Sequence, residues 1–376
     1  MSRGPWLLWA HWARGKFAWH WIGMVPALLL SCWLGLGLAA GVQELNVFIW
    51  NNSFSAALIA RFEAECGCRV RLTYFGSMEE ALAKLAGGAR GFDIIGPSSY
   101  GIPPLVRLGL LQPLTKQAIP NARNLDPAYL DTPLDPGNVY SLPYDFTITL
   151  IGYNATSLRE LGLDASSWAL VFDPRLLASI RGKVTVLDDP REVIAAALRY
   201  KGHSVNSTDP AHLREAQAVI RAAMPYWAAF NNQSYIRELT VGNIWVVLGY
   251  SNDIYQARID AQQASRPFTI GSSLQKEGNG MTADSFVIPK SAPNPALAHR
   301  FIDFMLRAEN AAEITNALGA GNPNVAARAF IRPDLLADSV INPGAAAQKR
   351  LEHLNDLDSR TRRAWNRAWT ELKVGH

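Results

Sequence analysis

The sequence predicts an α/β protein of two lobes that are joined by hinge strands and separated by a cleft. Three observations predict this fold class. The chain has 376 residues, of which 49% are hydrophobic and 18% charged, which suits two globular cores and is too apolar for a disordered chain. Short apolar strands alternate with helical segments in two separate runs. Long β-prone segments connect the two runs, as expected of strands that cross between lobes.

A leader segment precedes the predicted lobes. Residues 22–40 are apolar apart from Ser31, a basic stretch comes before them, and small residues dominate positions 37–41. This three-part pattern is typical of a secretory signal peptide, which we place at residues 1–41. Two alternatives stay open. The apolar stretch is just long enough for an uncleaved membrane anchor, and Cys32 is a candidate for lipid attachment.

Composition and motifs exclude several classes of protein. Most of the net charge of +4 comes from Arg3, Arg14 and Lys16 in the leader, so the rest of the chain offers no basic surface for nucleic acid. The histidines do not recur at the spacing of metal ligands. The segment GPSSY at 96–100 lacks the second glycine of a nucleophile elbow. We therefore predict no metal, no cofactor and no enzymatic activity.

The first run of elements predicts a parallel sheet with helices on both faces. It consists of strands at 45–50, 69–75 and 91–97 that alternate with helices at 55–65 and from residue 78 onward. Ser77 and Glu80 have the spacing of a capping box at the start of the second helix.

The second run follows a long β-prone segment at residues 141–153. It contains strands at 183–187 and 244–250 and helices at 190–200, 210–223 and 252–262. Residues 284–289 form another β-prone crossing, and a helix at 296–306 follows them. We predict that one lobe comprises 42–148 and 285–326, and that the other comprises 149–284 and 327–376.

Polar and aromatic residues gather just past the predicted strands, where open α/β sheets bind their ligands. Carboxylates make charge-assisted hydrogen bonds with ammonium groups, and aromatic faces attract cations and cover methylene groups. The combination favours an elongated organic cation as the ligand. The candidate binding residues are Trp50, Asn51, Ser98, Tyr100, Asp189, Glu192, Tyr250, Asp253 and Asp284.

Each of these residue types also has a purely structural interpretation. Asp189 and Glu192 fit a capping box at a helix start, and Asp253 is placed to offset a helix dipole. Trp50 and Tyr250, each taken alone, are more typical of a core or a wall than of a ligand platform. What favours a binding site is that acids and rings from separate segments meet at one predicted cleft edge.

Cys66 and Cys68 are the cysteines that remain beyond the leader. They are separated by one glycine, so a disulfide between them closes a very short loop and gives little entropic stabilisation. Either a local disulfide or two half-buried thiols fit the sequence.

Several stretches of the chain also carry a family resemblance, among them FIWNNS at 48–53, FDIIGPSSY at 92–100, LDDPREV at 187–193 and DSFVIP at 284–289. Through them the chain resembles the periplasmic spermidine/putrescine-binding proteins of ABC importers. The resemblance implies a two-lobed periplasmic-binding-protein fold of type II that closes on its ligand. It implies a permease with a cytoplasmic ATPase as partner, and it assigns the candidate rings and carboxylates above to the ligand's methylenes and amino groups.

The chain departs from that family at several positions. Thr282 stands where the family usually has Trp or Phe, and Ala320 and Gly321 stand where an aromatic residue is frequent. Asn52 and Ser53 replace an acid and a Tyr. Each missing cation–π contact removes about 1 kcal/mol, so the departures leave the exact amine open.

The sequence thus predicts a periplasmic, monomeric solute-binding protein that delivers a putrescine- or spermidine-like cation to an ABC importer. Three alternatives remain: a binding protein for another small solute, a secreted enzyme on the same two lobes, and a sensor that keeps the fold without transport. We expect replacement of Glu192 by Gln or of Asp284 by Asn to weaken binding by about 2 kcal/mol or more.

Overall fold

The computed structural model describes residues 42–374. The predicted signal peptide at 1–41, and with it Cys32, therefore lies outside the described residues. No helix between residues 42 and 374 combines the length and hydropathy that a membrane span requires.

The strands of the described chain form one hydrogen-bonded sheet in the order β2-β1-β3-β9-β4-β7-β5-β6, with β8 on β4 and β10 on β9. Their bounds are β1 Glu44–Trp50, β2 Arg69–Phe75, β3 Ile94–Ile95, β4 Ser141–Asn154, β5 Val184–Val186, β6 Ala229–Phe230, β7 Val246–Tyr250, β8 Ile270–Ser273, β9 Asn279–Val287 and β10 Leu351–His353.

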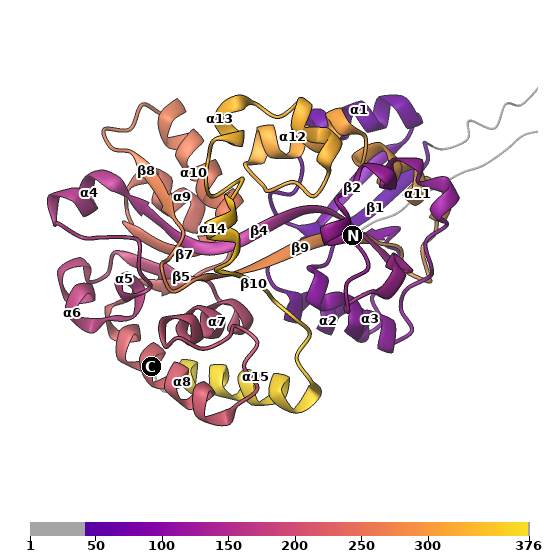
Figure 1. Cartoon of the computed structure of the whole chain (residues 1–376). Helices are drawn as coiled ribbons and strands as arrows, with labels where there is room; N and C mark the ends of the chain where they lie inside the picture. The colour runs from indigo at the N-terminus through magenta and orange to yellow at the C-terminus, as the bar shows by residue number, and fades with distance from the viewer. Residues whose placement is uncertain (1–41, 375–376) are drawn as a thin grey trace, which may run out of the picture. The chain divides into compact units, whose positions relative to one another are not determined.

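The sheet consists of two groups of parallel strands with two antiparallel strands, β4 and β9, between them. β1 is parallel to β2 and β3, and β5 is parallel to β6 and β7, which confirms the parallel arrangement predicted for the first run. β4 and β9 are antiparallel to each other, and each is antiparallel to the parallel group beside it. Figure 1 shows β4 and β9 running from the side of β1 and β2 to the side of β5 and β7. These are the predicted crossing strands.

Helices cover both groups of strands. Their bounds are α1 Ala56–Cys66, α2 Met78–Ala86, α3 Ile102–Arg107, α4 Ala155–Glu160, α5 Ala169–Phe172, α6 Pro174–Leu177, α7 Pro190–Tyr200, α8 Pro210–Ala223, α9 Tyr235–Val241, α10 Ser251–Gln263, α11 Pro295–Met305, α12 Ala308–Leu318, α13 Pro333–Leu336, α14 Ala345–Gln348 and α15 Ser359–Val374. The helices predicted at 190–200 and 210–223 are α7 and α8.

The third predicted strand is much shorter than residues 91–97. Only Ile94 and Ile95 of this segment form a strand, β3. Beside it the Asp93 backbone N–H donates to Asn46 O at 2.7 Å, and the Asp93 carboxylate accepts the backbone N–H of Asn46 and of Asn294. A short strand at this point brings the following residues close to β9, where Ser98 forms an isolated bridge with Asp284.

The crossing strands change hydrophobic core along their length. Tyr144 of β4 and Phe286 of β9 stack on each other, with ring centroids 4.2 Å apart, in the core that surrounds β1. Phe146 of β4 and Ala283 of β9 belong to the core that surrounds β5 and β7. Both strands therefore pass from one core to the other within a few residues. The lobe boundaries given above stay predictions.

Cys66 at the end of α1 is joined to Cys68 by a disulfide, with their Cα atoms 5.1 Å apart. Of the two alternatives that the sequence left open, the structure has the local disulfide. This disulfide lies next to the start of β2 and closes a loop of a single intervening residue.

Candidate functional site

A cavity of about 270 Å³ lies where the strand ends of the two groups face each other across β4 and β9. This volume is near the lower end of typical small-molecule pockets. The structure brings most of the candidate binding residues to its lining, namely Trp50, Asn51, Ser98, Tyr250, Asp253 and Asp284. Their ligand-binding roles stay predictions.

Two aromatic rings from opposite groups of strands form one side of the cavity. Trp50 ends β1 and Tyr250 ends β7, and their ring centroids are 6.0 Å apart at an angle of 61°. Phe75, at the end of β2, supports Trp50 at 4.6 Å. The indole Nε1 of Trp50 is buried and has no hydrogen-bond partner among the described residues, so a donor is left over on this side of the cavity.

Asp253 lies in the first turn of α10, directly after β7. Its carboxylate accepts hydrogen bonds from the Tyr235 hydroxyl and from Asn52 Nδ2, the latter at 3.2 Å. Burial raises the pKa of Asp253, and these two hydrogen bonds oppose that rise. Because both partners are neutral, the charge of the carboxylate is not offset by them.

Asp284 lies on β9, close to the point at which β9 changes core. Its Oδ1 accepts a hydrogen bond from Ser98 Oγ at 2.6 Å. Burial raises the pKa of Asp284 to about 7, and the Ser98 hydroxyl acts in the opposite direction. Two residues before Asp284 on β9, Thr282 faces Thr147 of β4, and their hydroxyls are 3.4 Å apart. Both threonines line the same cavity.

The charge of the lining is negative. Besides Asp253 and Asp284 it includes Glu80, whose carboxylate accepts the backbone N–H of Gly76 at 2.8 Å, and among the described residues it includes no Lys, Arg or His. In that same part of the chain no three His, Cys, Asp or Glu side chains are arranged to hold a metal ion. Buried carboxylates without a protein cation attract a cationic ligand.

Polar contacts join the two groups of strands around the cavity. Asn52 follows β1 and donates to Asp253 of α10, as described above. Asn232 follows β6, and its Nδ2 donates to Gly76 O at 3.1 Å and to Asp188 O at 3.0 Å. With the Trp50–Tyr250 ring contact, these bonds hold the rims of the cavity together.

The structure keeps Tyr100, Asp189 and Glu192 away from the cavity lining. Asp189 is fully buried and caps α7, where its side chain accepts from Arg191 N at 2.8 Å and from Glu192 N at 3.3 Å. Glu192 is buried and accepts a hydrogen bond from Thr149 Oγ1 of β4 at 2.6 Å. The Tyr100 ring lies 5.8 Å from the Arg191 guanidinium. For Asp189 the capping interpretation therefore describes the observed contacts.

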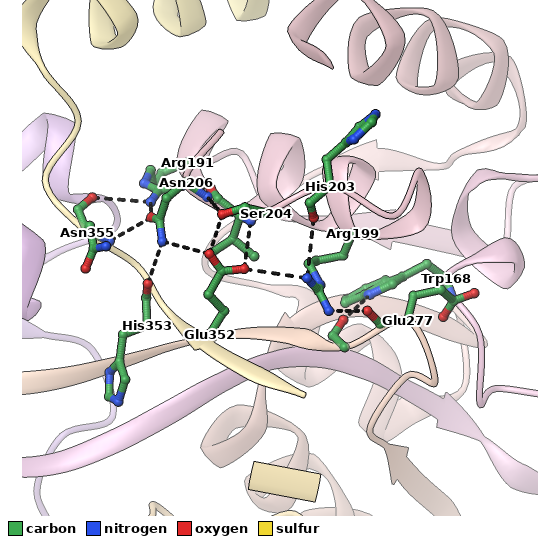
Figure 2. A network of polar contacts seen from close by, with 12 residues as sticks. Trp168, Arg191, Arg199, His203, Ser204, Asn206, Glu277, Glu352, His353 and Asn355 are labelled. Carbon is green, nitrogen blue, oxygen red and sulfur yellow. Dashed lines mark hydrogen bonds and ion pairs between the residues drawn. The ribbon is translucent and has the colours of Figure 1, made fainter. Parts of the chain in front are cut away.

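A network of polar contacts explains why the start of α7 is closed (Figure 2). Arg191 Nη1 donates to Val205 O at 2.7 Å, and Nη2 donates to Asn355 O at 3.2 Å and to the Asn206 side chain. Asn206 in turn donates to Glu352 Oε1 at 3.1 Å. The C-terminal segment that contains β10 is thereby fixed against α7 and covers its first turn.

Sequence reasoning missed several lining residues, which are Tyr74, Phe75, Gly76, Glu80, Thr147, Asn232, Gln233, Asn252 and Thr282. Tyr74, Phe75 and Gly76 lie at and just after the carboxyl end of β2, so the position rule that selects the other candidates applies to them too, although the adjacent Ser77 is a helix cap. Thr282, one of the departures from the family pattern, also lines the cavity. Asn252 has a buried Oδ1 with no partner among the described residues, which no sequence pattern signals.

Comparison with known protein families gives a match over residues 57–341, to bacterial extracellular solute-binding proteins. Among curated proteins, a putrescine/cadaverine-binding protein of Pseudomonas aeruginosa is 49% identical over 353 residues, which cover 93% of this chain and 100% of that protein. A putrescine-binding periplasmic protein of Escherichia coli is 32% identical over 360 residues, which cover 94% of this chain and 97% of that protein.

Solved structures show the same similarity. A spermidine/putrescine ABC transporter substrate-binding protein of Streptococcus pneumoniae aligns with a TM-score of 0.73 and 26% identity, covering 88% of this chain and 99% of that chain. More distant structures, such as a GABA receptor at 19% identity and a TM-score of 0.68, share the fold alone. The predicted two-lobed α/β fold is thereby confirmed.

Proposed function

Because the chain belongs to the bacterial extracellular solute-binding proteins, we propose that it binds a short linear diamine of the putrescine and cadaverine class and delivers it to an ABC importer. The family consists of binding proteins, in agreement with the prediction that the chain is not an enzyme. The two curated relatives described above are named for putrescine or cadaverine. Their names support this ligand class.

The observation that carries the proposal is a pair of buried carboxylates on separate segments of one cavity. Asp253 comes from α10 and Asp284 from β9, and neither has a Lys, Arg or His within 4.0 Å among the described residues. A diamine supplies one ammonium group for each. The rings of Trp50 and Tyr250 then cover the methylene groups between the two charges.

The size of the cavity favours a short ligand. A volume of about 270 Å³ suits a chain of a few methylene groups better than a long, branched or sugar-bearing molecule. Thr282 contributes a small side chain to the lining, so the cavity keeps space beside Asp284 that a Trp or Phe would fill. The fold by itself does not select the ligand, since distant neighbours of the same fold are titled for agropinic acid and for GABA.

Closure of the two lobes on the ligand follows from contacts made by both. Trp50, Asn51 and Ser98 come from the β1 side, and Tyr250 and Asp253 come from the β7 side. A ligand that bonds to both sides favours the closed state, because its contacts with the second side exist only there. We propose a periplasmic, monomeric protein whose closed form docks on a permease with a cytoplasmic ATPase.

Calorimetry with a ligand panel tests the proposed function. The mature chain is titrated with putrescine, cadaverine, spermidine, GABA and a neutral sugar under identical conditions. We expect the two diamines to bind most tightly and the sugar not to bind. Tight binding of GABA or the sugar with no response to any diamine would reject the proposed ligand class while leaving the family assignment intact.

A further inference from the structure

Asp145 is a buried acid that the proposed function does not use. It lies on β4 with 3% of its surface exposed, its Oδ1 has no hydrogen-bond partner among the described residues, and it does not line the cavity. The Asp284 backbone donates to the Asp145 carboxylate, but a buried carboxylate with one oxygen unpaired and no cation beside it is costly in its charged form. Its neighbour on β9 is Asp284.

The register of the two crossing strands places these acids side by side. Asp145 pairs with Asp284, and Thr147 pairs with Thr282. The two threonine hydroxyls meet at 3.4 Å, so they point to one face of the sheet. Asp145 lies two residues before Thr147 on β4, and Asp284 lies two residues after Thr282 on β9. Side chains two residues apart on a strand point to the same face, so both acids share the face of the threonines. Directly opposed residues in an antiparallel pair have Cβ atoms about 4.5–5.5 Å apart.

The surroundings of the pair contain no compensating positive charge. Within residues 42–374 no Lys, Arg or His lies within 4.0 Å of either carboxylate. The titratable groups that face the pair are Tyr144 of β4 and Glu192 of α7, and the Ser98 hydroxyl is a neutral donor. The pair also lies where β4 and β9 pass from one core to the other.

Two opposed carboxylates in such a site do not both ionise at neutral pH, because each charge disfavours the other. Burial raises the pKa of Asp145 well above its ordinary value, and the charge of Asp284 raises it further. An entering ammonium group changes this balance, since it supplies the positive charge that lets the second carboxylate ionise. The net charge of the site is the same before and after, with one proton exchanged for one ammonium.

We propose that Asp145 and Asp284 share one proton when the cavity is empty, and that an ammonium group arriving at Asp284 displaces this proton to solvent. The O–H bond of the shared carboxyl breaks, its electron pair stays on the carboxylate oxygen, and the ammonium N–H donates to that carboxylate. Asp145 acts through Asp284 as a positioning residue, and it couples ligand binding to pH. The proposal rests on the proposed function, because it needs a cationic ligand at Asp284.

Calorimetry in buffers of different ionisation enthalpy tests this coupling. Putrescine is titrated at pH 7 into the wild type, Asp145→Asn and Glu192→Gln. Its own amines, with pKa values of about 10, stay protonated there. We expect the wild type and Glu192→Gln to release a larger fraction of a proton on binding than Asp145→Asn, in which only the proton held by Asp284 itself is left to displace. The wild-type Kd should rise by up to about tenfold per pH unit as the pH falls from 7 to 6. The Kd of Asp145→Asn should rise less, because only Asp284 then takes up a proton.

The outcomes separate the two proposals. Diamine binding with no proton release in the wild type would overturn the proposal that Asp145 and Asp284 share a proton, and it would leave the proposed function in place. Proton release that is undiminished in Asp145→Asn would also overturn the shared proton, and its loss in Glu192→Gln would assign the proton to Glu192. Absence of binding by any cation would reject both proposals. The melting temperature of ligand-free Asp145→Asn, expected to equal or exceed that of the wild type at pH 8, shows whether the variant is folded.

Discussion

Two helix starts, those of α7 and α10, differ in what covers them. Both follow strands that lie next to each other and run parallel, β5 and β7, and both carry acids in or at the first turn. Asp253 of α10 lines the cavity. Asp189 and Glu192 at the start of α7 are buried and do not line it, and the C-terminal segment beside them binds Arg191. The same residue types at the same kind of position therefore serve different purposes.

The difference teaches that a strand-to-helix junction does not by itself make a binding site. At α7 the helix carries its own buried cation, Arg191, and the covering segment supplies an acceptor for it, Asn355 O, beside Val205 O. At α10 the acid has neutral partners, Asn52 and Tyr235, and faces open volume. The excess of negative charge at α10 is what a cationic ligand relieves.

The largest expected effect is at α7. Replacing Arg191 with Met leaves Val205 O and Asn355 O without the Arg191 donor and removes one of the two donors to Asn206 Oδ1. It also removes the positive charge that lowers the pKa of the buried Glu192. Removing one partner of such a buried charged group costs about 3–5 kcal/mol. We expect chemical denaturation to show a loss of this size, and diamine affinity of the protein that remains folded to change little.

A stability change below about 1 kcal/mol in Arg191→Met would contradict the closed network at α7. Arg258→Met provides a matched control, because Arg258 forms a partly exposed ion pair with Asp338 at 3.0 Å. Partly exposed pairs contribute about 1 kcal/mol or less, so this second variant should unfold at nearly the wild-type denaturant concentration.

The next effect is at α10. Replacing Asp253 with Asn removes a buried charge from the cavity, and we expect diamine affinity to fall by about 2 kcal/mol, or roughly 30-fold. Asp260→Asn is the control, since it removes the same charge from the same helix two turns away from the cavity, where Asp260 accepts from Gln256. Equal affinities of the two variants in calorimetry would remove Asp253 from the site.

The smallest effect is expected at Glu192, and here the structure revises the expectation from sequence. Because Glu192 bonds to Thr149 outside the cavity lining, Glu192→Gln should weaken diamine binding by less than about tenfold. Calorimetry measures the difference directly. A loss of affinity as large as that of Asp253→Asn would show that Glu192 takes part in ligand binding.

The pH dependence of stability gives Glu192→Gln a second readout. Burial raises the pKa of Glu192 to about 7, so the folded state holds this proton more tightly than the unfolded state. The stability that this group contributes is present below the unfolded pKa of about 4.3 and is lost as the pH rises toward 7. Thermal unfolding of ligand-free protein should show Glu192→Gln above the wild type at pH 8 and close to it at pH 5.

Much of the candidate site follows from the sequence, because residues past the carboxyl ends of parallel strands meet at one edge. Trp50, Tyr250 and Asp253 were located by that rule and line the cavity. Asp284 was found within a β-prone crossing. The rule also selected Asp189, since a capping acid and a ligand-binding acid have the same sequence pattern.

Amphipathic periodicity, turn residues and the order of elements are local properties, and the sequence by itself determined them here: the two runs, the crossing strands and the helices at 190–200 and 210–223. Only the tertiary structure decided which acids face the cavity and which are covered. It also decided that Asp145, a lone acid in an apolar strand, lies opposite Asp284. The physical reason is that burial and strand register depend on contacts between segments far apart in the chain, which no local pattern encodes.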